Sequence, residues 1–261
     1  MTDFSAQALS ELFARICLSA GPAVMEVYHS DFTPEQKADK SPVTLADQRA
    51  EAIILDALQA GLPDIPVLAE ESFAAGLRPD IDGDFILVDP VDGTKEFINK
   101  RDEFTINIAY IRDRHPLAGA VYAPAKARLY WGGEAAYALD IAPGESFSLG
   151  NAERLHTQKG KAGAMIAVMS RSHADEETLN FAKQAGVSDT VSAGSSLKFC
   201  LLAEGKAHLY PRFGPTMEWD TAAGHGVLNA AGGSVTNPDG TPFLYGKTDA
   251  GYLNAAFIAR G

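Results

Sequence analysis

The sequence has few cysteines, no surplus of positive charge and no long uninterrupted apolar run. Its 261 residues include only two cysteines, Cys17 and Cys200, and 22 Lys and Arg stand against 34 Asp and Glu, for a net charge of −12. Both cysteines lie in apolar, helix-like segments. We therefore expect small buried thiols in a reducing compartment rather than a disulfide or a nucleophile.

The charge and the apolar pattern also limit the partners. A net charge of −12 argues against a nucleic acid polymer, which is bound through clustered Lys and Arg. A small anionic substrate is compatible with it if local cations or metal ions attract that substrate. No run approaches the roughly 18 apolar residues of a membrane span. We therefore predict no stable membrane insertion, and the sequence does not indicate an oligomeric state.

The first 27 residues have the apolar spacing of an amphipathic helix, with Leu9, Phe13, Ile16, Ala20 and Val24 on one side. They lack the basic start and continuous apolar centre of a signal peptide. We expect a cytoplasmic protein, and a peripheral association with the inner membrane stays open.

The pattern of apolar runs changes near Asn151. Residues 1–150 begin with helical segments and continue as a series of strands joined by short turns, which is typical of an antiparallel sheet. Residues 151–261 alternate strands with helices, and we expect mostly helix over 197–211 and a helix over 221–233. The chain thus favours an α/β (mixed α+β) fold with two sheet-containing halves, 1–150 and 151–261, and a site where strand ends from both meet.

The stretch VDPVDGTKEF, residues 88–97, places Asp89 and Asp92 three positions apart at the end of an apolar strand. Like charges this close raise each other's pKa unless a cation lies between them. The carbonyl of Val91 lies in the same turn, and oxygen donors of this kind suit a hard divalent ion. Upstream, Glu70 and Glu71 end another apolar strand. Simple solvated turn residues are the alternative for each acidic group.

Two further acidic residues have alternative interpretations. Asp47 follows Thr44 by three positions before an apolar helical run, which is the spacing of a capping box. Its carboxylate is also suited to hold a hydroxyl in place. Asp220, just before a helix rich in Ala and Gly, is either an N-cap or a metal ligand at a helix start that faces a phosphate.

Taken together, these segments resemble the inositol monophosphatase family of metal-dependent phosphatases. The family pattern is an E-E element, then D-P-[ILV]-D-G-T and later W-D, matched here by Glu70-Glu71, by residues 89–94 and by Trp219-Asp220. Residues 95–97 (KEF), 40–47 (KSPVTLAD), 170–173 (SRSH) and 194–225 are similar to the branch of bacterial 3'(2'),5'-bisphosphate nucleotidases. The resemblance implies a layered αβαβα sandwich of the inositol monophosphatase/fructose-1,6-bisphosphatase type.

For the reaction, the resemblance implies removal of the 3'-phosphate of 3'-phosphoadenosine 5'-phosphate to give AMP and phosphate, as part of sulfate assimilation. Two or three Mg²⁺ ions would activate the attacking water, and Li⁺ would inhibit. The implied metal ligands are Glu70, Asp89, the carbonyl of Val91, Asp92 and Asp220. The implied catalytic residues are Glu70, Thr94 and Asp47, with Thr94 hydrogen-bonded to Asp47 and orienting the water.

Cations are expected to hold the second phosphate of such a substrate, and Lys198 is the strongest candidate. Arg171 and Arg212 are weaker ones, and a solvent-exposed charge is the alternative for all three. His225 could approach the nucleotide or lie in the core. The full set of candidate substrate-binding residues is Asp92, Gly93, Thr94, Lys95, Arg171, Ser195, Ser196, Lys198, Arg212 and Asp220.

Three rival functions remain open at this stage. The first is an inositol monophosphatase or a broad sugar-phosphate phosphatase, which shares the same motifs. The second is a non-catalytic protein that binds a phosphorylated ligand, although every implied ligand position carries an oxygen donor. The third is an acidic cluster that holds only a structural ion. Preference among 3'-phosphoadenosine 5'-phosphate, its sulfated form and the 2'-isomer is not encoded in any motif identified here.

Overall fold

The structure, a computed structural model, describes residues 4–32, 35–36, 42–161, 163–169 and 175–261. Its larger sheet has seven strands in chain order: β3 (Val67–Ala69), β4 (Phe85–Asp92), β5 (Thr105–Arg112), β6 (His115–Ala123), β7 (Arg128–Gly132), β8 (Ala136–Asp140) and β9 (Glu153–Arg154). Only β3 and β4 pair in parallel, and the other neighbours are antiparallel. The expected series of antiparallel strands is therefore present.

The second sheet has five strands in the order β11 (Val187–Ser192), β10 (Met165–Met169), β12 (Leu209–Arg212), β16 (Phe257–Arg260) and β14 (Ser234–Thr236). Strand β10 pairs in parallel with β11 and β12, whereas β16 runs antiparallel to its neighbours. Two short ribbons complete the sheets: β1 (Glu35–Gln36) with β2 (Pro42–Val43), and β13 (Thr216–Met217) with β15 (Leu253–Asn254).

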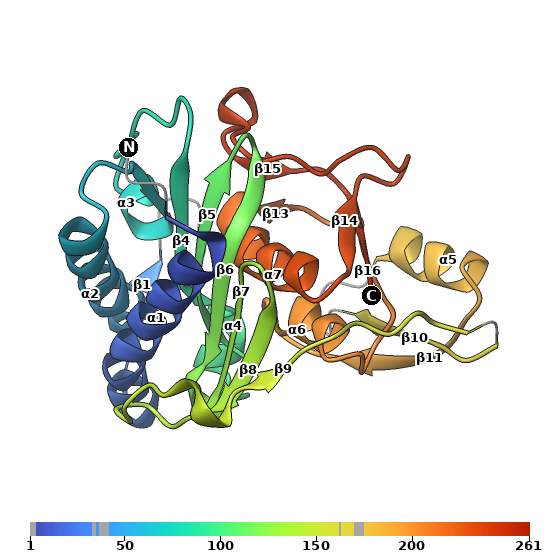
Figure 1. Cartoon of the computed structure of the whole chain (residues 1–261), viewed down its shortest axis with the longest axis horizontal. Helices are drawn as coiled ribbons and strands as arrows, with labels where there is room; N and C mark the ends of the chain where they lie inside the picture. The colour runs from blue at the N-terminus through green and yellow to red at the C-terminus, as the bar shows by residue number, and fades with distance from the viewer. Residues whose placement is uncertain (1–3, 33–34, 37–41, 162, 170–174) are drawn as a thin grey trace.

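Helices cover both sheets and give five layers, α-β-α-β-α (Figure 1). Helices α1 (Ala6–His29) and α2 (Leu45–Gly61) pack on one face of the larger sheet. Helices α6 (Leu197–Ala203) and α7 (Glu218–Ala230) lie between the two sheets, and α5 (Glu176–Gln184) covers the outer face of the smaller one. The short elements are α3 (Glu70–Ala74), α4 (Thr94–Ile98), η1 (Pro124–Lys126), η2 (Leu149–Asn151) and η3 (Thr248–Ala250). The predicted αβαβα sandwich is confirmed.

Helix α1 is long and apolar enough to cross a membrane if length and composition alone are considered. In the structure it is a core helix: Leu9, Phe13 and Val24 are buried in the cluster between α1, α2 and the larger sheet. The apolar side predicted for residues 1–27 is therefore the side that packs on the sheet. Burial of that stripe is the main source of this helix's stability.

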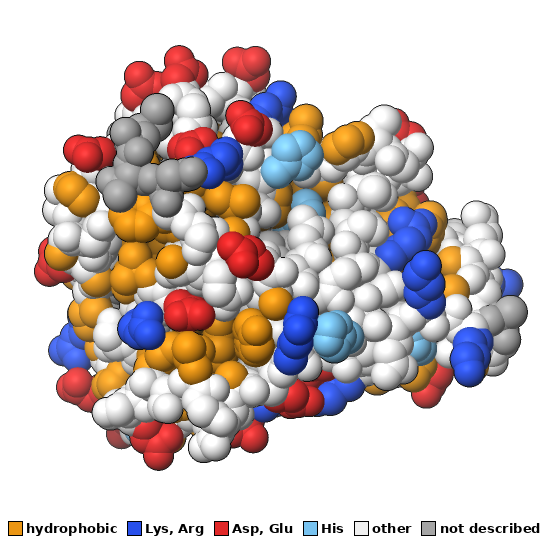
Figure 2. Space-filling view, in the orientation of Figure 1, with side chains coloured by type: hydrophobic (Ala, Val, Ile, Leu, Met, Phe, Trp, Pro, Cys, Tyr) orange, Lys and Arg blue, Asp and Glu red, His pale blue; other side chains and the backbone are white. Residues whose placement is uncertain are grey.

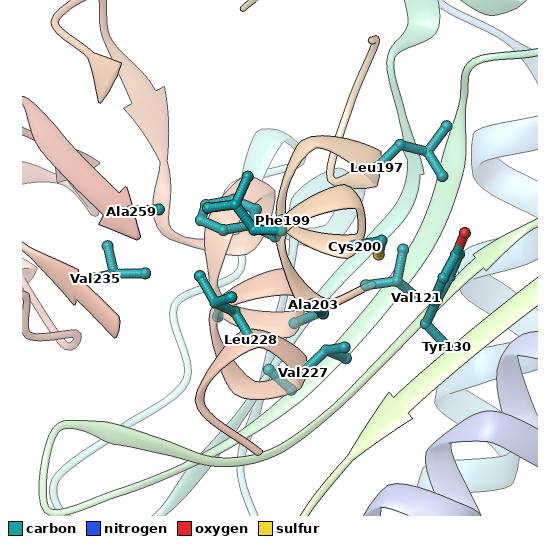
Figure 3. Packing of buried hydrophobic residues seen from close by; sticks show 14 of the residues in the cluster. Val121, Tyr130, Leu197, Phe199, Cys200, Ala203, Val227, Leu228, Val235 and Ala259 are labelled. Atoms are coloured by element: carbon teal, nitrogen blue, oxygen red, sulfur yellow. The ribbon is translucent and has the colours of Figure 1, made fainter. Parts of the chain in front are cut away.

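A second cluster fills the space between the sheets (Figure 3). Phe199 of α6 and Leu228 of α7 point toward Val235 and Ala259 of the smaller sheet, while Cys200 faces the larger one. Both cysteines are buried free thiols, as expected, and burial raises the pKa of each. A protonated buried thiol is a poor nucleophile, so neither cysteine offers a second reaction centre.

The expectation of mostly helix over residues 197–211 was wrong in its second half. Helix α6 ends at Ala203, and Gly205 follows with a φ of +69°, a conformation that ends helices. His208 then joins the smaller sheet, and residues 209–212 form β12 between β10 and β16. The helix expected over 221–233 is present but begins earlier, at Glu218.

Charged side chains of both signs are mixed over the face shown in Figure 2, with Lys and Arg lying singly or in small groups. An extended polyanion requires a continuous basic track, and the described residues on the face shown in Figure 2 do not form one.

Helix α7 approaches the larger sheet so closely that β6 has no room for a side chain at position 119. A Cβ on Gly119 would lie 2.4 Å from the carbonyl oxygen of Ala223, on the facing turn of α7. Gly119→Ala should lower the free energy of unfolding by about 1–3 kcal/mol, because the helix must move away. Thermal unfolding beside Gly150→Ala, whose Cβ has no neighbour closer than 3.8 Å, is the measurement. Equal transition temperatures would contradict the close approach.

Candidate active site

Asp89 and Asp92 lie where β4 leaves regular pairing with β5. Asp89 pairs with Asn107 and Asp92 with Thr105, and the register shifts between the two aspartates. Pro90 has no N–H for the ladder, which explains the irregularity at this point. Asp89 is buried, and its Oδ1 accepts a hydrogen bond of 3.1 Å from the Val91 N–H. The bulge thus turns both carboxylates toward one end of the sheet.

Glu70 reaches the same end from the neighbouring strand. Strand β3 runs parallel to β4 and ends at Ala69, so Glu70 begins helix α3 rather than ending a strand as expected. The start of α3 is fixed by buried Glu51 of α2. Its two carboxylate oxygens accept from the N–H of Glu71 and from the N–H of Ser72, each at 2.8 Å. Glu51 was not identified from the sequence.

Asp220 lies in the first turn of α7, three positions after the N-cap Met217, and is not itself the N-cap. Its Oδ2 accepts a 2.8 Å hydrogen bond from the Met217 N–H, and its carbonyl accepts one of 2.8 Å from the Ser196 hydroxyl. The N-cap interpretation was therefore wrong by one turn, because sequence alone does not fix where the helix begins.

The predicted capping box at Asp47 is confirmed. Its Oδ2 accepts hydrogen bonds from the Thr44 N–H at 2.8 Å and from the Thr44 hydroxyl at 2.7 Å, at the start of α2. The negative charge of Asp47 also acts on Asp89 and helps to raise the pKa of that carboxyl. The cap therefore lies within the acidic cluster. The Thr94 hydroxyl donates to the Val91 carbonyl at 3.3 Å, and its predicted bond to Asp47 stays a prediction.

Burial and mutual repulsion dominate the electrostatics of this cluster. Burial raises the pKa of Asp89 well above its ordinary value, and the charges of Glu70 and Asp92 raise it further. The pKa of Asp220 is raised well above its ordinary value by burial and then by the same two charges. Burial raises the pKa of Asp92 to about 6, even though nearby Lys198 opposes the change. Without a cation, this arrangement disfavours ionisation.

These residues fit a hard divalent cation by their chemistry. The candidate donors are buried or half-buried oxygens, the carboxylates among them repel one another, and a bound Mg²⁺ would remove that repulsion. Within the described ranges, no three His, Cys, Asp or Glu side chains already converge closely enough to hold an ion. Two of the candidate metal ligands already accept hydrogen bonds within the protein: Asp220 from the Met217 N–H and the Val91 carbonyl from the Thr94 hydroxyl. The individual ligand roles of Glu70, Asp89, Val91, Asp92 and Asp220 stay predictions.

A pocket of about 540 Å³ opens beside the acidic cluster and brings together parts of both sequence halves. Acidic residues and cations lie together in its wall. The complete lining is Glu70, Asp92, Gly93, Thr94, Lys95, Glu96, Gly194, Ser195, Lys198, Phe199, Tyr210, Arg212, Pro215, Thr216, Asp220 and Thr221. A larger pocket of about 920 Å³ also touches Glu70 and Asp220, but its wall is mainly apolar around Phe73 and Trp219. The smaller pocket has the mixed charge that a phosphate ester at a metal site requires.

Tight backbone turns form one wall of this pocket. Gly93 has a φ of +91°, and a Cβ there would lie 3.1 Å from the Glu103 carbonyl oxygen. Gly194 packs against the same carbonyl, at 2.5 Å from its ideal Cβ position. Ser195 follows with a φ of +46°, which is unusual for a residue with a side chain and indicates local strain. The two turns therefore meet across Glu103.

The two described candidate cations are buried and not solvent-exposed. Lys198 Nζ donates to the Ser195 carbonyl at 2.6 Å, and burial lowers the pKa of this lysine to about 8 although Asp92 favours its charge. Arg212 donates through Nε to the Gly214 carbonyl and through Nη2 to the Pro215 carbonyl, at 3.1 Å each. Arg171 lies outside the described residues. The exposed-charge alternative was therefore wrong for both described cations.

His225 lies in the core and not at the pocket. Its Nδ1 is 3.0 Å from the Tyr245 hydroxyl, and burial lowers its pKa to about 3, so the ring is neutral at ordinary pH. Of the two alternatives, the core residue is the correct one.

Two polar residues of β5 were missed. Asn107 donates through Nδ2 to the Ser196 hydroxyl at 3.1 Å and to Asp92 at 3.4 Å, and the Thr105 hydroxyl donates to that of Ser195 at 3.2 Å. They connect the strand beneath the aspartates to the turn before α6. Their signal was the alternation of Thr105 and Asn107 with isoleucines, which puts both polar side chains on one face of the strand.

Comparison with known proteins identifies the family. The model of the inositol monophosphatase family matches residues 6–258 of this chain. The chain belongs to the inositol monophosphatase family. Within it, the chain is 43% identical to the 3'(2'),5'-bisphosphate nucleotidase CysQ of Escherichia coli K12 over 245 residues, covering 93% of this chain and 96% of that protein. It is also 43% identical to the protein of the same name from Salmonella typhimurium LT2, covering 95% and 97%.

Solved structures of the family have the same architecture. CysQ from Bacteroides thetaiotaomicron superimposes with a TM-score of 0.81 at 35% identity, covering 98% of this chain and 97% of that one. An inositol monophosphatase from Thermotoga maritima gives a TM-score of 0.75 at 23% identity, covering 96% and 91%, which supports the fold alone. The family resemblance and the fold class inferred from the sequence are both confirmed.

The raised pKa of Asp92 gives a testable dependence of stability on pH. Its pKa rises from 3.8 to about 6 on folding, so the metal-free folded protein binds more protons than the unfolded chain between those values. This contribution therefore lowers stability as pH rises through that window. In EDTA, Asp92→Asn should be more stable than the parent by about 3 kcal/mol above pH 6, with little difference near pH 4.

The control for this measurement is Asp249→Asn, because Asp249 is exposed on η3. Chemical unfolding of the three proteins from pH 4 to pH 8 provides the comparison. A difference between parent and Asp92→Asn that does not change with pH would contradict the repulsion inferred for the cluster.

Proposed function

We propose that this protein is a Mg²⁺-dependent 3'(2'),5'-bisphosphate nucleotidase that converts 3'-phosphoadenosine 5'-phosphate to AMP and phosphate. The observation that carries the proposal is the 540 Å³ pocket in which half-buried carboxylates and two buried cations, Lys198 and Arg212, line one wall. A substrate with two phosphates needs both kinds of group. The names of the relatives at 43% identity support the same activity.

The two parts of the wall have different tasks in this proposal. Glu70, Asp89, the Val91 carbonyl, Asp92 and Asp220 would hold the Mg²⁺ ions, which when bound supply Lewis acidity at the phosphoryl oxygens and lower the pKa of water. Lys198 and Arg212 would neutralise the phosphate that is not cleaved.

The protein's own groups then need only to orient the reactants. Thr94 would orient a water for attack on phosphorus, and Glu70 would accept its proton. The P–O bond to the 3'-oxygen breaks, and the departing oxygen takes a proton from solvent. Because phosphoryl transfer involves little covalent work by the protein, positioning and charge stabilisation account for most of the rate. Ser195 and Ser196 would hold the turn that carries Lys198.

The cellular setting is part of the same proposal. The reaction would clear a by-product of sulfate assimilation in the cytoplasm, and Li⁺ would inhibit it by competing at an Mg²⁺ position. The protein would act on free nucleotides and not on nucleic acid polymers, in line with its net charge of −12.

A substrate panel tests the activity. With Mg²⁺, kcat/KM for 3'-phosphoadenosine 5'-phosphate should exceed that for inositol 1-phosphate and for 3'-AMP by at least about tenfold, because only the first substrate engages the buried cations. Phosphate release without Mg²⁺ should fall to background. Equal or faster turnover of the inositol ester would identify a broad inositol- or sugar-phosphate phosphatase. No turnover of any ester at saturating Mg²⁺ would indicate a binding protein or a structural ion site.

Lys198→Met tests recognition of the second phosphate. Loss of a charged hydrogen bond costs about 1.5–3 kcal/mol, so KM for 3'-phosphoadenosine 5'-phosphate should rise about 10- to 100-fold. Turnover of 3'-AMP should change little. Lys206→Met, at a lysine with 63% of its side chain exposed, is the matched control. Equal losses for both substrates would show that Lys198 acts elsewhere.

The lowered pKa of Lys198 predicts a pH effect with a defined sign. A lysine with a pKa of about 8 is charged below that pH and neutral above it, so kcat/KM for the bisphosphate should fall as pH rises through 8. The Lys198→Met protein should lack this fall in kcat/KM for the bisphosphate. Any fall in kcat/KM that the parent shows with 3'-AMP should remain in the variant. A parent profile that stays flat from pH 7 to pH 9.5 would refute the assignment.

A further inference from the structure

An ion pair between buried Glu218 and half-buried Lys247 lies beside the first turn of α7, the turn that carries Asp220. Glu218 is fully buried, and its Oε2 accepts from the Gly246 N–H at 2.8 Å. Its Oε1 accepts from the Lys247 N–H at 2.9 Å and from Lys247 Nζ at 3.2 Å. Both carboxylate oxygens are therefore satisfied by a segment that follows α7 in the chain.

Asn254 of β15 connects this pair to the helix. Its Oδ1 accepts from Lys247 Nζ at 3.0 Å, and its Nδ2 donates to the Met217 carbonyl at 2.8 Å and to the Thr221 hydroxyl at 3.1 Å. Strand β15 also pairs with β13, which places Met217 opposite Leu253. Residues 217, 218 and 221 are thus all held by the same segment.

Asp220 lies inside this bonded turn. Its carboxylate accepts from the Met217 N–H, and Met217 is itself held through its carbonyl by Asn254. The neighbouring Glu218 would add one more negative charge to a region already crowded with carboxylates. Lys247 neutralises that charge at a distance of 3.2 Å.

Stability alone is a weak reason for such a pair. The desolvation of two buried charges often equals or exceeds their attraction, and apolar residues of similar size would stabilise as well. Fixed hydrogen bonds behind a ligating carboxylate do have a recognised effect, since they set its orientation and the affinity for the metal.

We propose that Lys247, Glu218 and Asn254 form a positioning network that fixes Asp220 for metal binding. Lys247 acts through Glu218 and Asn254 and touches neither metal nor substrate. This inference rests on the Mg²⁺ dependence proposed above. The segment 246–254, which is remote in sequence from the acidic motifs, thus determines how tightly the site binds its ion.

The test compares Mg²⁺ binding by the parent, by Lys247→Met and by the double variant Glu218→Gln/Lys247→Met, which leaves no unpaired buried charge. The matched control is Arg128→Met, because Arg128 forms a comparable pair with Glu204, whose side chain is only 4% exposed, at the end of α6. Calorimetric titration of each metal-free protein with Mg²⁺ gives the affinity. The fluorescence of Trp219, which lies between Glu218 and Asp220, reports on the same turn in a Trp131→Phe background.

Removal of a bond behind a metal ligand typically weakens affinity 10- to 100-fold, and we expect about tenfold weaker Mg²⁺ binding in both Lys247 variants. The Mg²⁺ concentration for half-maximal phosphatase rate should rise by the same factor, and saturating Mg²⁺ should restore most of kcat. Arg128→Met should lower the unfolding temperature while Mg²⁺ affinity stays within twofold of the parent.

Two results would overturn the proposal. The first is Mg²⁺ affinity within twofold of the parent in the folded double variant, which would make the network merely structural. The second is a loss of kcat in the Lys247 variants that saturating Mg²⁺ does not restore. If Lys247→Met fails to fold, the double variant alone decides. A parent protein that itself binds no Mg²⁺ would refute the proposed function instead, so the two failures are distinguishable.

Discussion

Repulsion between buried carboxylates is the constraint on which this structure depends. Asp89, Asp92 and Asp220 have pKa values raised by burial and by one another, so the folded chain holds them together at a cost. Other bonds hold the segments of these aspartates in place, at the β4 bulge and in the first turn of α7, and Glu51 does the same for the start of α3, which carries Glu70. A cation converts the same arrangement from unfavourable to favourable, which makes metal binding and stability two aspects of one interaction.

The fold divides the two kinds of charge between its sheets. Acidic groups come from the end of the larger sheet and from α7, and the buried cations come from α6 and β12 beside the smaller sheet. Asn107 joins the two sides, because its amide contacts both Asp92 and Ser196. The pocket wall therefore carries carboxylates beside cations, and Lys198 is close enough to Asp92 to oppose the rise of its pKa.

Much of the fold and the centre of the site could be predicted from the sequence, because short-range patterns encode them. The Asp89–Asp92 motif, the Thr44–Asp47 capping box and the apolar stripe of α1 are local features that are visible in the chain. Glu51 and Asn107 were missed because their hydrogen-bond partners are distant in the sequence. The partners of Glu51 lie at least 20 positions away, and those of Asn107 at least 15. Strand β12 was taken for helix because its pairing with β10 and β16 is a tertiary effect that local propensity does not contain.

The position of Asp220 relative to its helix was predicted incorrectly by one turn. The sequence placed Asp220 next to a helix start, but the helix begins one turn earlier than its small-residue pattern indicates. Asn254 of β15 holds Met217, and the Lys247 N–H, which precedes β15, holds Glu218. Helix boundaries set by a distant strand are beyond any reading of neighbouring residues. The roles of individual ligands are likewise not given by the chain alone.

The close seating of α7 on the glycines of β6 and β7 has a consequence for biosynthesis. Helix α7 is synthesised late and packs between both sheets. A nascent chain that stops before α7 therefore contains Asp89 and Asp92 but lacks Asp220. Such a chain would lack one of the five proposed metal donors. If Asp220 holds the ion as proposed, phosphatase activity requires synthesis of the chain through α7.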